Sequence, residues 1–162
     1  MFQCIIYDED APSAKLIGVE YIISSETYAS LDSDEQKLWH SHAYEVQSGM
    51  LYDPKGDSTA DLPHMEALMT TYGKTWHTWQ VDLGHKVPLG PPQLMMAFTK
   101  DGQLSPNLLA SRDERCKKNT EEVKASRGHL KLQEPVHPSA NHWETGKGEV
   151  MQVHCGTTPF KG

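Results

Sequence analysis

Long hydrophobic runs are absent from this chain, and so are clusters of basic residues. The longest apolar stretches resemble Leu94–Phe98 and fall far short of the roughly 20 residues that a membrane-spanning helix needs. With 15 Lys and Arg against 22 Asp and Glu, the net charge is -7, so nucleic-acid binding is not expected. No apolar segment precedes the acidic stretch Tyr7–Asp10, which argues against a signal peptide. We therefore predict a soluble, cytoplasmic protein with no transmembrane segment.

Cysteine is scarce as well. The three cysteines, Cys4, Cys116 and Cys155, are odd in number and far apart, and they show no C-x-x-C spacing. This pattern excludes a disulfide scaffold and predicts reduced thiols. The 162 residues, of which 37% are hydrophobic, suffice for one domain with its own core. We predict a single domain over residues 1–155 and a flexible tail over 156–162.

The pattern of β-branched residues, turn signals and helix caps predicts an α+β fold, with a mixed or antiparallel sheet and two to four helices. Strands are expected over residues 3–7, 15–24, 74–81, 94–99 and 149–154. The capping box 33–36 and the closing Gly49 predict one long helix over residues 34–48. Further helices are expected over residues 61–72, ended by Gly73, over 107–117, and just after Asn119.

Several sequence blocks, spread over nearly the whole chain, resemble the oil body-associated protein family of plants, fungi and bacteria. They are Cys4–Asp8, Ala14–Tyr21, Lys37–Gly49, Tyr72–Asp82 and Pro88–Gly90 with Leu94–Met96, with a weaker match around Trp143. The resemblance implies a location at oil bodies, the lipid droplets of seeds. It implies no catalytic activity, because none of these blocks is a known catalytic signature.

One departure from the family concerns the N-terminus. Family members usually carry an extension that contains adjacent histidines and a cysteine. In this sequence Met1 comes almost directly before the first matching block, which begins at Cys4. Any ligands or lipid-contact surface that such an extension supplies are therefore expected to be missing here.

Residues 40–45 are the first candidate site and read His-Ser-His-Ala-Tyr-Glu. This spacing is similar to the first metal motif of cupins, in which alternate histidines on a strand point the same way. In the helix predicted over residues 34–48, however, residues two apart point about 200° apart, so His40 and His42 are not expected to share a metal. His42 and Glu45 are three apart and share a helix face. We therefore place His42 and Glu45 in the site and leave His40 outside it.

The second candidate is His77, in a predicted strand that is rich in Trp and Thr. If His77 faces the helix, then His42, Glu45 and His77 form a two-histidine, one-carboxylate group of the kind that binds zinc or non-haem iron. Glu45 beside apolar walls would have a raised pKa and suit a general base. The alternative is structural, because a buried His42 bonded only to Glu45 needs no metal.

Two functions remain open at this point. The first is a small domain that binds a hydrophobic organic ligand, either as a metal-dependent or as an acid–base enzyme, with a role in secondary metabolism by analogy only. Its predicted ligand-binding walls are Trp39, Tyr44, Trp76, Trp79 and Gln80. The alternative is a non-catalytic protein on the lipid-droplet surface, held there by an amphipathic face or a partner. His40 and Tyr44, if exposed, are candidates for a homodimer contact.

Overall fold

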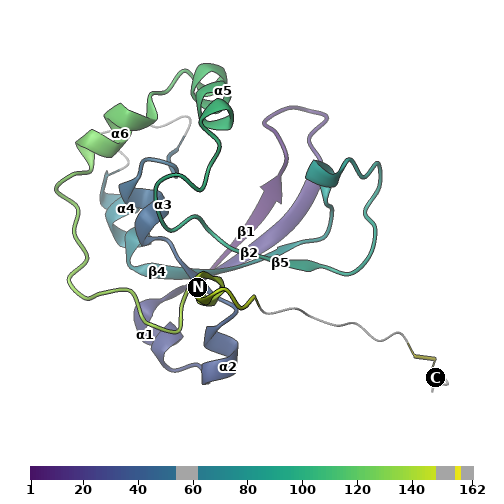
Figure 1. Ribbon diagram of the computed structural model, residues 1–162, viewed down its shortest axis with the longest axis horizontal. Coiled ribbons are helices and arrows are strands. Elements are labelled where there is room, and N and C mark those ends of the chain that lie inside the picture. Colours follow the sequence, from purple (N-terminus) through teal and green to yellow (C-terminus); the bar gives the residue numbers. More distant parts are fainter. Residues whose placement is uncertain (54–61, 149–155, 158–162) are drawn as a thin grey trace.

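The computed structural model describes residues 1–53, 62–148 and 156–157. Its centre is a five-stranded antiparallel sheet (Figure 1). Strand β1 (Phe2–Tyr7) pairs with β2 (Leu16–Ser24), and β2 pairs with β4 (Thr71–His77). The other edge of β4 is shared by β3 (His40–Ser41) and β5 (Gln93–Met95). The predicted α+β class with an antiparallel sheet is confirmed.

Strands β1 and β2 lie close to the predicted ranges, because their β-branched and aromatic residues and the turn between them are local signals. The Asp8 carboxylate closes this turn by accepting the backbone N–H of Lys15 at 2.8 Å and pairing with its Nζ at 2.8 Å. Strand β5 is shorter than the predicted 94–99. The last predicted strand, 149–154, lies outside the described residues.

The long helix predicted over residues 34–48 is wrong. It is replaced by α2 (Ser33–Gln36), strand β3 and α3 (Ala43–Gln47). Asp32 caps α2, because its Oδ1 accepts the backbone N–H groups of Asp34 and Glu35. Beyond α2, Trp39 packs into a buried core and the next two residues pair with β4. Sheet pairing and core packing thus override the local preference for helix.

Gly73 also differs from its predicted role as a helix end. Helix α4 (Leu62–Met69) stops earlier, and Gly73 lies in the middle of β4. The hydroxyl of Thr71 donates to the carbonyl of Leu68 at 2.7 Å, which satisfies one carbonyl at the end of α4. Helix α5 (Pro106–Cys116) and α6 (Thr120–Ser126) match their predictions closely, and the Asn119 side chain caps α6 as expected.

The sheet is covered on both faces, by different elements (Figure 1). Helix α1 (Ser25–Ala29) and the segment that holds the 3-10 helix η2 (His142–Thr145) lie on one face, over an aromatic core. In this core Tyr28 stacks on Tyr72 with ring centroids 3.9 Å apart. Helices α3 and α4 cover the other face with a second core, formed by Ala43, Val46, Met65, Met69 and Leu130.

The buried guanidinium of Arg127 ties α6 to the end of α3. Arg127 is 2% exposed and donates to the carbonyl oxygens of Val46 at 2.8 Å and Leu51 at 2.6 Å. Arg112 on α5 likewise donates to the carbonyl of Met50 at 2.7 Å. These hydrogen bonds hold the α5–α6 segment against α3 and the residues that follow it.

Candidate functional site

A cavity of about 570 Å³ lies between the second face of the sheet and helices α3 and α4. Most of its lining is apolar and includes Ile22, Leu51, Leu68, Met95, Met96 and Ala97. Its polar lining includes Glu20, His40, His42, Glu45 and His77. An apolar cavity of this size with a few convergent polar groups is typical of a small-molecule site.

Three polar side chains converge at one point of this cavity. Glu20 lies on β2, His40 on β3, and His42 at the residue that precedes α3. Glu20 Oε1 is 3.0 Å from His40 Nε2 and 3.2 Å from His42 Nε2. Among the described residues, this is the group of His, Cys, Asp or Glu side chains whose ligand atoms all lie within 4.8 Å of one another.

The placement of His40 corrects the prediction that it lies on an exposed helix face. His40 is only 4% exposed and His42 only 2% exposed. Because His40 lies in a strand and His42 follows just beyond it, residues two apart point to the same side, and the two rings meet edge to face with centroids 5.2 Å apart. A buried His40 is not available for a homodimer contact. Tyr44 is half-buried and donates to Asp101, and a homodimer remains a prediction.

Gly73 of β4 lies directly beneath the three side chains of Glu20, His40 and His42. A Cβ atom at Gly73 would lie 2.2 Å from Glu20 Oε1, 2.6 Å from His40 Nε2 and 2.8 Å from His42 Nε2. All three distances are shorter than any van der Waals contact, so a larger residue would push the three polar atoms apart. The sheet therefore holds the group together only because β4 carries no side chain at this position.

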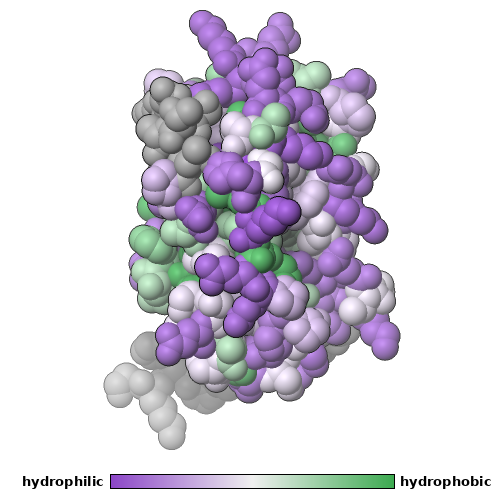
Figure 2. Space-filling view, turned by 90° about the vertical axis from the view of Figure 1, so that its left-hand side faces the viewer, coloured by the Kyte–Doolittle hydropathy of each residue, from purple (hydrophilic) through white to green (hydrophobic). Residues whose placement is uncertain are grey.

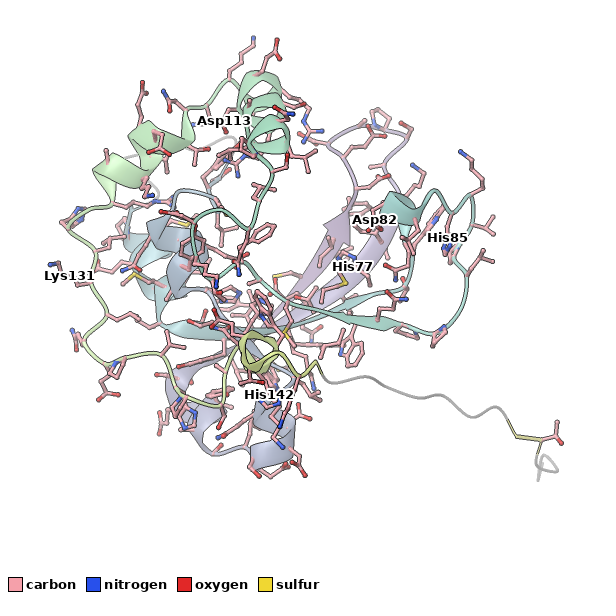
Figure 3. The ribbon with its side chains drawn as sticks, viewed as in Figure 1. His77, Asp82, His85, Asp113, Lys131 and His142 are labelled. Carbon is pink, nitrogen blue, oxygen red and sulfur yellow. The ribbon has the colours of Figure 1, made fainter. Side chains whose placement is uncertain are left out.

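Glu45 and His77 line the same cavity but stand outside this group. Burial raises the pKa of Glu45, attraction to His40 and His42 partly offsets that rise, and Glu20 adds to it. Burial lowers the pKa of His77, against a smaller opposing effect of Asp82, which lies in the 3-10 helix that follows β4 (Figure 3). The predicted residues His42, Glu45 and His77 thus share one cavity. A catalytic or metal-binding role for Glu45 and His77 remains a prediction.

The predicted ligand-binding walls lie elsewhere. None of Trp39, Tyr44, Trp76, Trp79 and Gln80 lines this cavity. Trp76 alternates with His77 along β4 and so points to the other face of the sheet, where Trp39 packs in the aromatic core. Trp79 lies beyond the end of β4 and donates its indole N–H to the carbonyl of His85 at 3.0 Å. The ligand-binding role of these residues gains no support from the cavity.

Glu20 is the residue that sequence reasoning missed. Its signal was present, because a lone carboxylate interrupts the apolar run of β2, next to the buried Ile22 and Ile23. Burial alone would raise the pKa of Glu20, but hydrogen bonds with His40 and His42 hold that pKa well below its usual range. The fold thus places a half-buried carboxylate in contact with two histidines.

Comparison with known proteins places the chain in a family. The family model described as "Protein of unknown function (DUF1264)" matches residues 1–131. This chain belongs to that family. The chain is 43% identical to oil body-associated protein 2C of Arabidopsis thaliana over 154 residues, which cover 93% of this chain and 65% of that protein.

Other members of the family are about as similar. Oil body-associated protein 1B of Arabidopsis thaliana is 40% identical over 162 residues, with 99% of this chain and 66% of the relative covered. Oil body-associated protein 2B of Zea mays is 42% identical over 158 residues, with 94% and 63% covered. The chain thus spans less than two thirds of the length of these curated relatives, between 63% and 66%. No solved structure matches the chain.

Proposed function

We propose that this chain works at the surface of oil bodies as a peripheral, non-catalytic protein. Relatives that are 40–43% identical to it are named oil body-associated proteins, which supports this location. In the described part of the chain, no helix is both long enough and apolar enough to cross a membrane. The attachment that we propose is therefore peripheral and depends on exposed apolar side chains.

The distribution of exposed apolar side chains carries this proposal. Among the described residues, the large hydrophobic side chains that are exposed are Met1, Phe2, Ile5, Tyr7, Leu16, Tyr21, Leu83, Val87, Leu89 and Leu108. Except for Leu108, these residues lie in two segments. Met1 to Tyr21 belong to the β1–β2 hairpin, and Leu83, Val87 and Leu89 lie at the end of the 3-10 helix η1 (Val81–Leu83) and in the loop that follows it. Figure 1 places this hairpin and this loop on the right-hand side of the molecule.

The opposite side of the molecule is more hydrophilic. Figure 2 shows the left-hand side of Figure 1, where hydrophilic side chains dominate and hydrophobic ones gather toward the middle. An apolar end and a hydrophilic end suit a protein that rests on a lipid monolayer with one side only. We call the apolar end the droplet-facing end, formed by β1, β2 and the loop over residues 81–92.

Charge at the droplet-facing end favours a neutral lipid surface. The turn between β1 and β2 carries Asp8, Glu9 and Asp10, and of these Asp8 is paired with Lys15. Acidic groups here give no attraction to anionic headgroups. We therefore expect hydrophobic insertion to dominate, so that binding to neutral droplets is nearly independent of salt concentration.

Flotation with artificial droplets, made of triacylglycerol coated with phosphatidylcholine, tests the proposal. A variant with Leu83→Ser, Val87→Ser and Leu89→Ser is expected to lose binding by at least about tenfold per residue, because each inserted side chain contributes about 1.5–3 kcal/mol. Leu108→Ser is the matched control, since Leu108 is 63% exposed and Leu83 is 66% exposed. Equal loss in both variants, or no loss in the triple variant, would contradict the proposal.

A hydrophobic-ligand site is the second candidate function, and the cavity of about 570 Å³ favours it. Glu45, with its raised pKa, would serve as a general base toward a ligand in this cavity. A fluorescent fatty-acid analogue is expected to bind the native chain, and Leu68→Trp, which fills the cavity, is expected to abolish binding. Leu108→Trp is the control. Unchanged binding by the Leu68→Trp variant would exclude this cavity as the ligand site.

A further inference from the structure

We propose that Glu20, His40 and His42 bind one divalent transition-metal ion. The ligand atoms are Glu20 Oε1 and the two Nε2 atoms, and the remaining coordination position faces the cavity. The three ligand side chains line the cavity, whereas Leu83, Val87 and Leu89, which the droplet test replaces, do not. The metal proposal and the droplet proposal can therefore fail independently of each other.

The three ligand atoms lie within 4.8 Å of one another, and the two distances from Glu20 Oε1 already match the ligand spacing around a metal ion. Zinc binds nitrogen and oxygen ligands at about 2.0–2.2 Å, so two ligands of a tetrahedral ion lie roughly 3.3 Å apart. Glu20 Oε1 is already 3.0 Å from His40 Nε2 and 3.2 Å from His42 Nε2. Two strands, β2 and β3, and the residue that precedes α3 supply these atoms, and the missing side chain of Gly73 leaves room for them.

The hydrogen-bond network places a proton on Nδ1 of His42. The single hydroxyl proton of Thr71 is donated to the carbonyl of Leu68 at 2.7 Å. The Thr71 oxygen must then accept from His42 Nδ1, which is 2.8 Å away. A neutral His42 with its proton on Nδ1 has a lone pair on Nε2. That lone pair faces the Glu20 oxygen at 3.2 Å.

Two electron-rich atoms that face each other at this distance repel unless a cation lies between them. A metal ion bound by both atoms turns this repulsion into two coordination bonds. The Nδ1–H bond to Thr71 then has the usual form of an outer-shell contact, which orients a metal-binding histidine and raises its basicity. His40 lacks such a contact, because its Nδ1 is buried with no hydrogen-bond partner among the described residues.

A doubly protonated His42 is the competing explanation. It would donate to both Thr71 and Glu20 and would form a buried ion pair. In that case a neutral His40 would donate its Nε2 proton to the same carboxylate oxygen, and its buried Nδ1 would keep a lone pair with no donor among the described residues. Three ligand atoms around one point match a metal site better than a salt bridge, and the experiment below separates the two.

The donor set determines the class of metal. Imidazole nitrogens with one carboxylate oxygen suit Zn²⁺, Fe²⁺ and Co²⁺, whereas Mg²⁺ and Ca²⁺ prefer oxygen ligands alone. Three protein ligands leave an open position for water or another molecule, as in zinc sites that bind substrates. Here that position faces an apolar cavity, so any molecule bound to the metal would have its apolar part in contact with Ile22, Leu68 and Met95.

Metal titration of the chelator-treated full chain tests the site. Calorimetry with Zn²⁺ is expected to show one ion bound per chain, and Co²⁺ is expected to give visible absorption bands of tetrahedral intensity. Glu20→Gln and His42→Ala are each expected to weaken Zn²⁺ binding by at least about 100-fold. Thr71→Val removes the contact with His42 together with the bond to the Leu68 carbonyl and is expected to weaken Zn²⁺ binding by about 10–100-fold, whereas Thr71→Ser keeps both bonds and is expected to retain binding.

Two matched controls exclude trivial explanations. His64→Ala removes another histidine that lines the same cavity and is expected to leave Zn²⁺ binding unchanged. His129→Ala removes an exposed histidine and is expected to have no effect. The proposal is overturned if the native chain binds no Zn²⁺ at micromolar concentration, or if the Glu20→Gln variant binds as tightly as the native chain. Two protonated nitrogens on His42 in Zn²⁺-treated protein, seen by nitrogen NMR, would establish the ion pair instead.

Discussion

Two neighbouring residues of β4 face opposite regions of the molecule. Tyr72 points into the aromatic core, where it stacks on Tyr28 at 3.9 Å and accepts the backbone N–H of His137 at 3.0 Å. Gly73 points to the other face, under the cluster of Glu20 and the two histidines. One face of the sheet is thus filled by aromatic side chains, while the other is kept open over a polar cluster.

This difference separates stability from function. A filled aromatic core contributes to folding through buried area and close packing. An open cavity with convergent polar groups contributes little to folding and is typical of a binding site. Substitutions on the two faces should therefore have separable effects, and three of them test this, in order of decreasing effect.

The largest expected effect is on the filled face. Tyr28 is 0% exposed, so Tyr28→Ala is expected to lower the free energy of unfolding by about 3–5 kcal/mol through loss of buried area and the cavity left behind. Urea denaturation followed by circular dichroism measures this change. Tyr21→Ala, at a position 37% exposed, is the control and should cost far less. Comparable losses in both variants would refute the assignment of stability to this core.

A smaller effect on the free energy of unfolding is expected from a substitution at the open face. Gly73→Ala places a Cβ atom 2.2 Å from Glu20 Oε1, so overpacking should lower the free energy of unfolding by about 1–3 kcal/mol. The same change should abolish Zn²⁺ binding, because the three ligand atoms must move apart. Gly128→Ala is the control, since its nearest contact would be 3.4 Å away. Tight Zn²⁺ binding by the Gly73→Ala variant would show that the cluster does not depend on this space.

The smallest effect concerns the α5–α6 segment beside the open face, where Asp113 lies (Figure 3). Burial alone would raise the pKa of Asp113, but hydrogen bonds from Thr120 and Arg112 lower it below its usual value. Because the pKa of Asp113 is lower in the folded state, its ionised carboxylate stabilises the fold at pH values above the unfolded-state pKa of about 3.9. That stabilisation is lost as the pH falls through the folded-state pKa.

Asp113→Asn is therefore expected to lower the free energy of unfolding by about 1–2 kcal/mol at pH 7. Below the folded-state pKa the native chain and the variant should be equally stable. Urea titrations at neutral and acidic pH measure this difference, and Zn²⁺ binding should be unaffected at pH 7. A stability difference that persists unchanged in acid would contradict the role of the carboxylate charge.

Locally determined elements could be predicted from the sequence. Strands β1 and β2 follow from β-branched and aromatic residues and one acidic turn, and α6 follows from Asn119 as its cap. The stretch from Leu38 to His42 could not be predicted in this way. Its helix signals are local, whereas its strand conformation depends on pairing with Tyr72 and Gly73, far along the chain.

The sequence by itself determined the family, the acidic charge and the spacing of His40 and His42, because these depend only on which residues follow one another. The tertiary structure alone decided that both histidines share one side and that their partner is Glu20, which is 20 residues before His40. The physical reason is the register of the sheet. Strand β4 places β2 on one edge and β3 on the other, and the glycine between them lets three side chains meet.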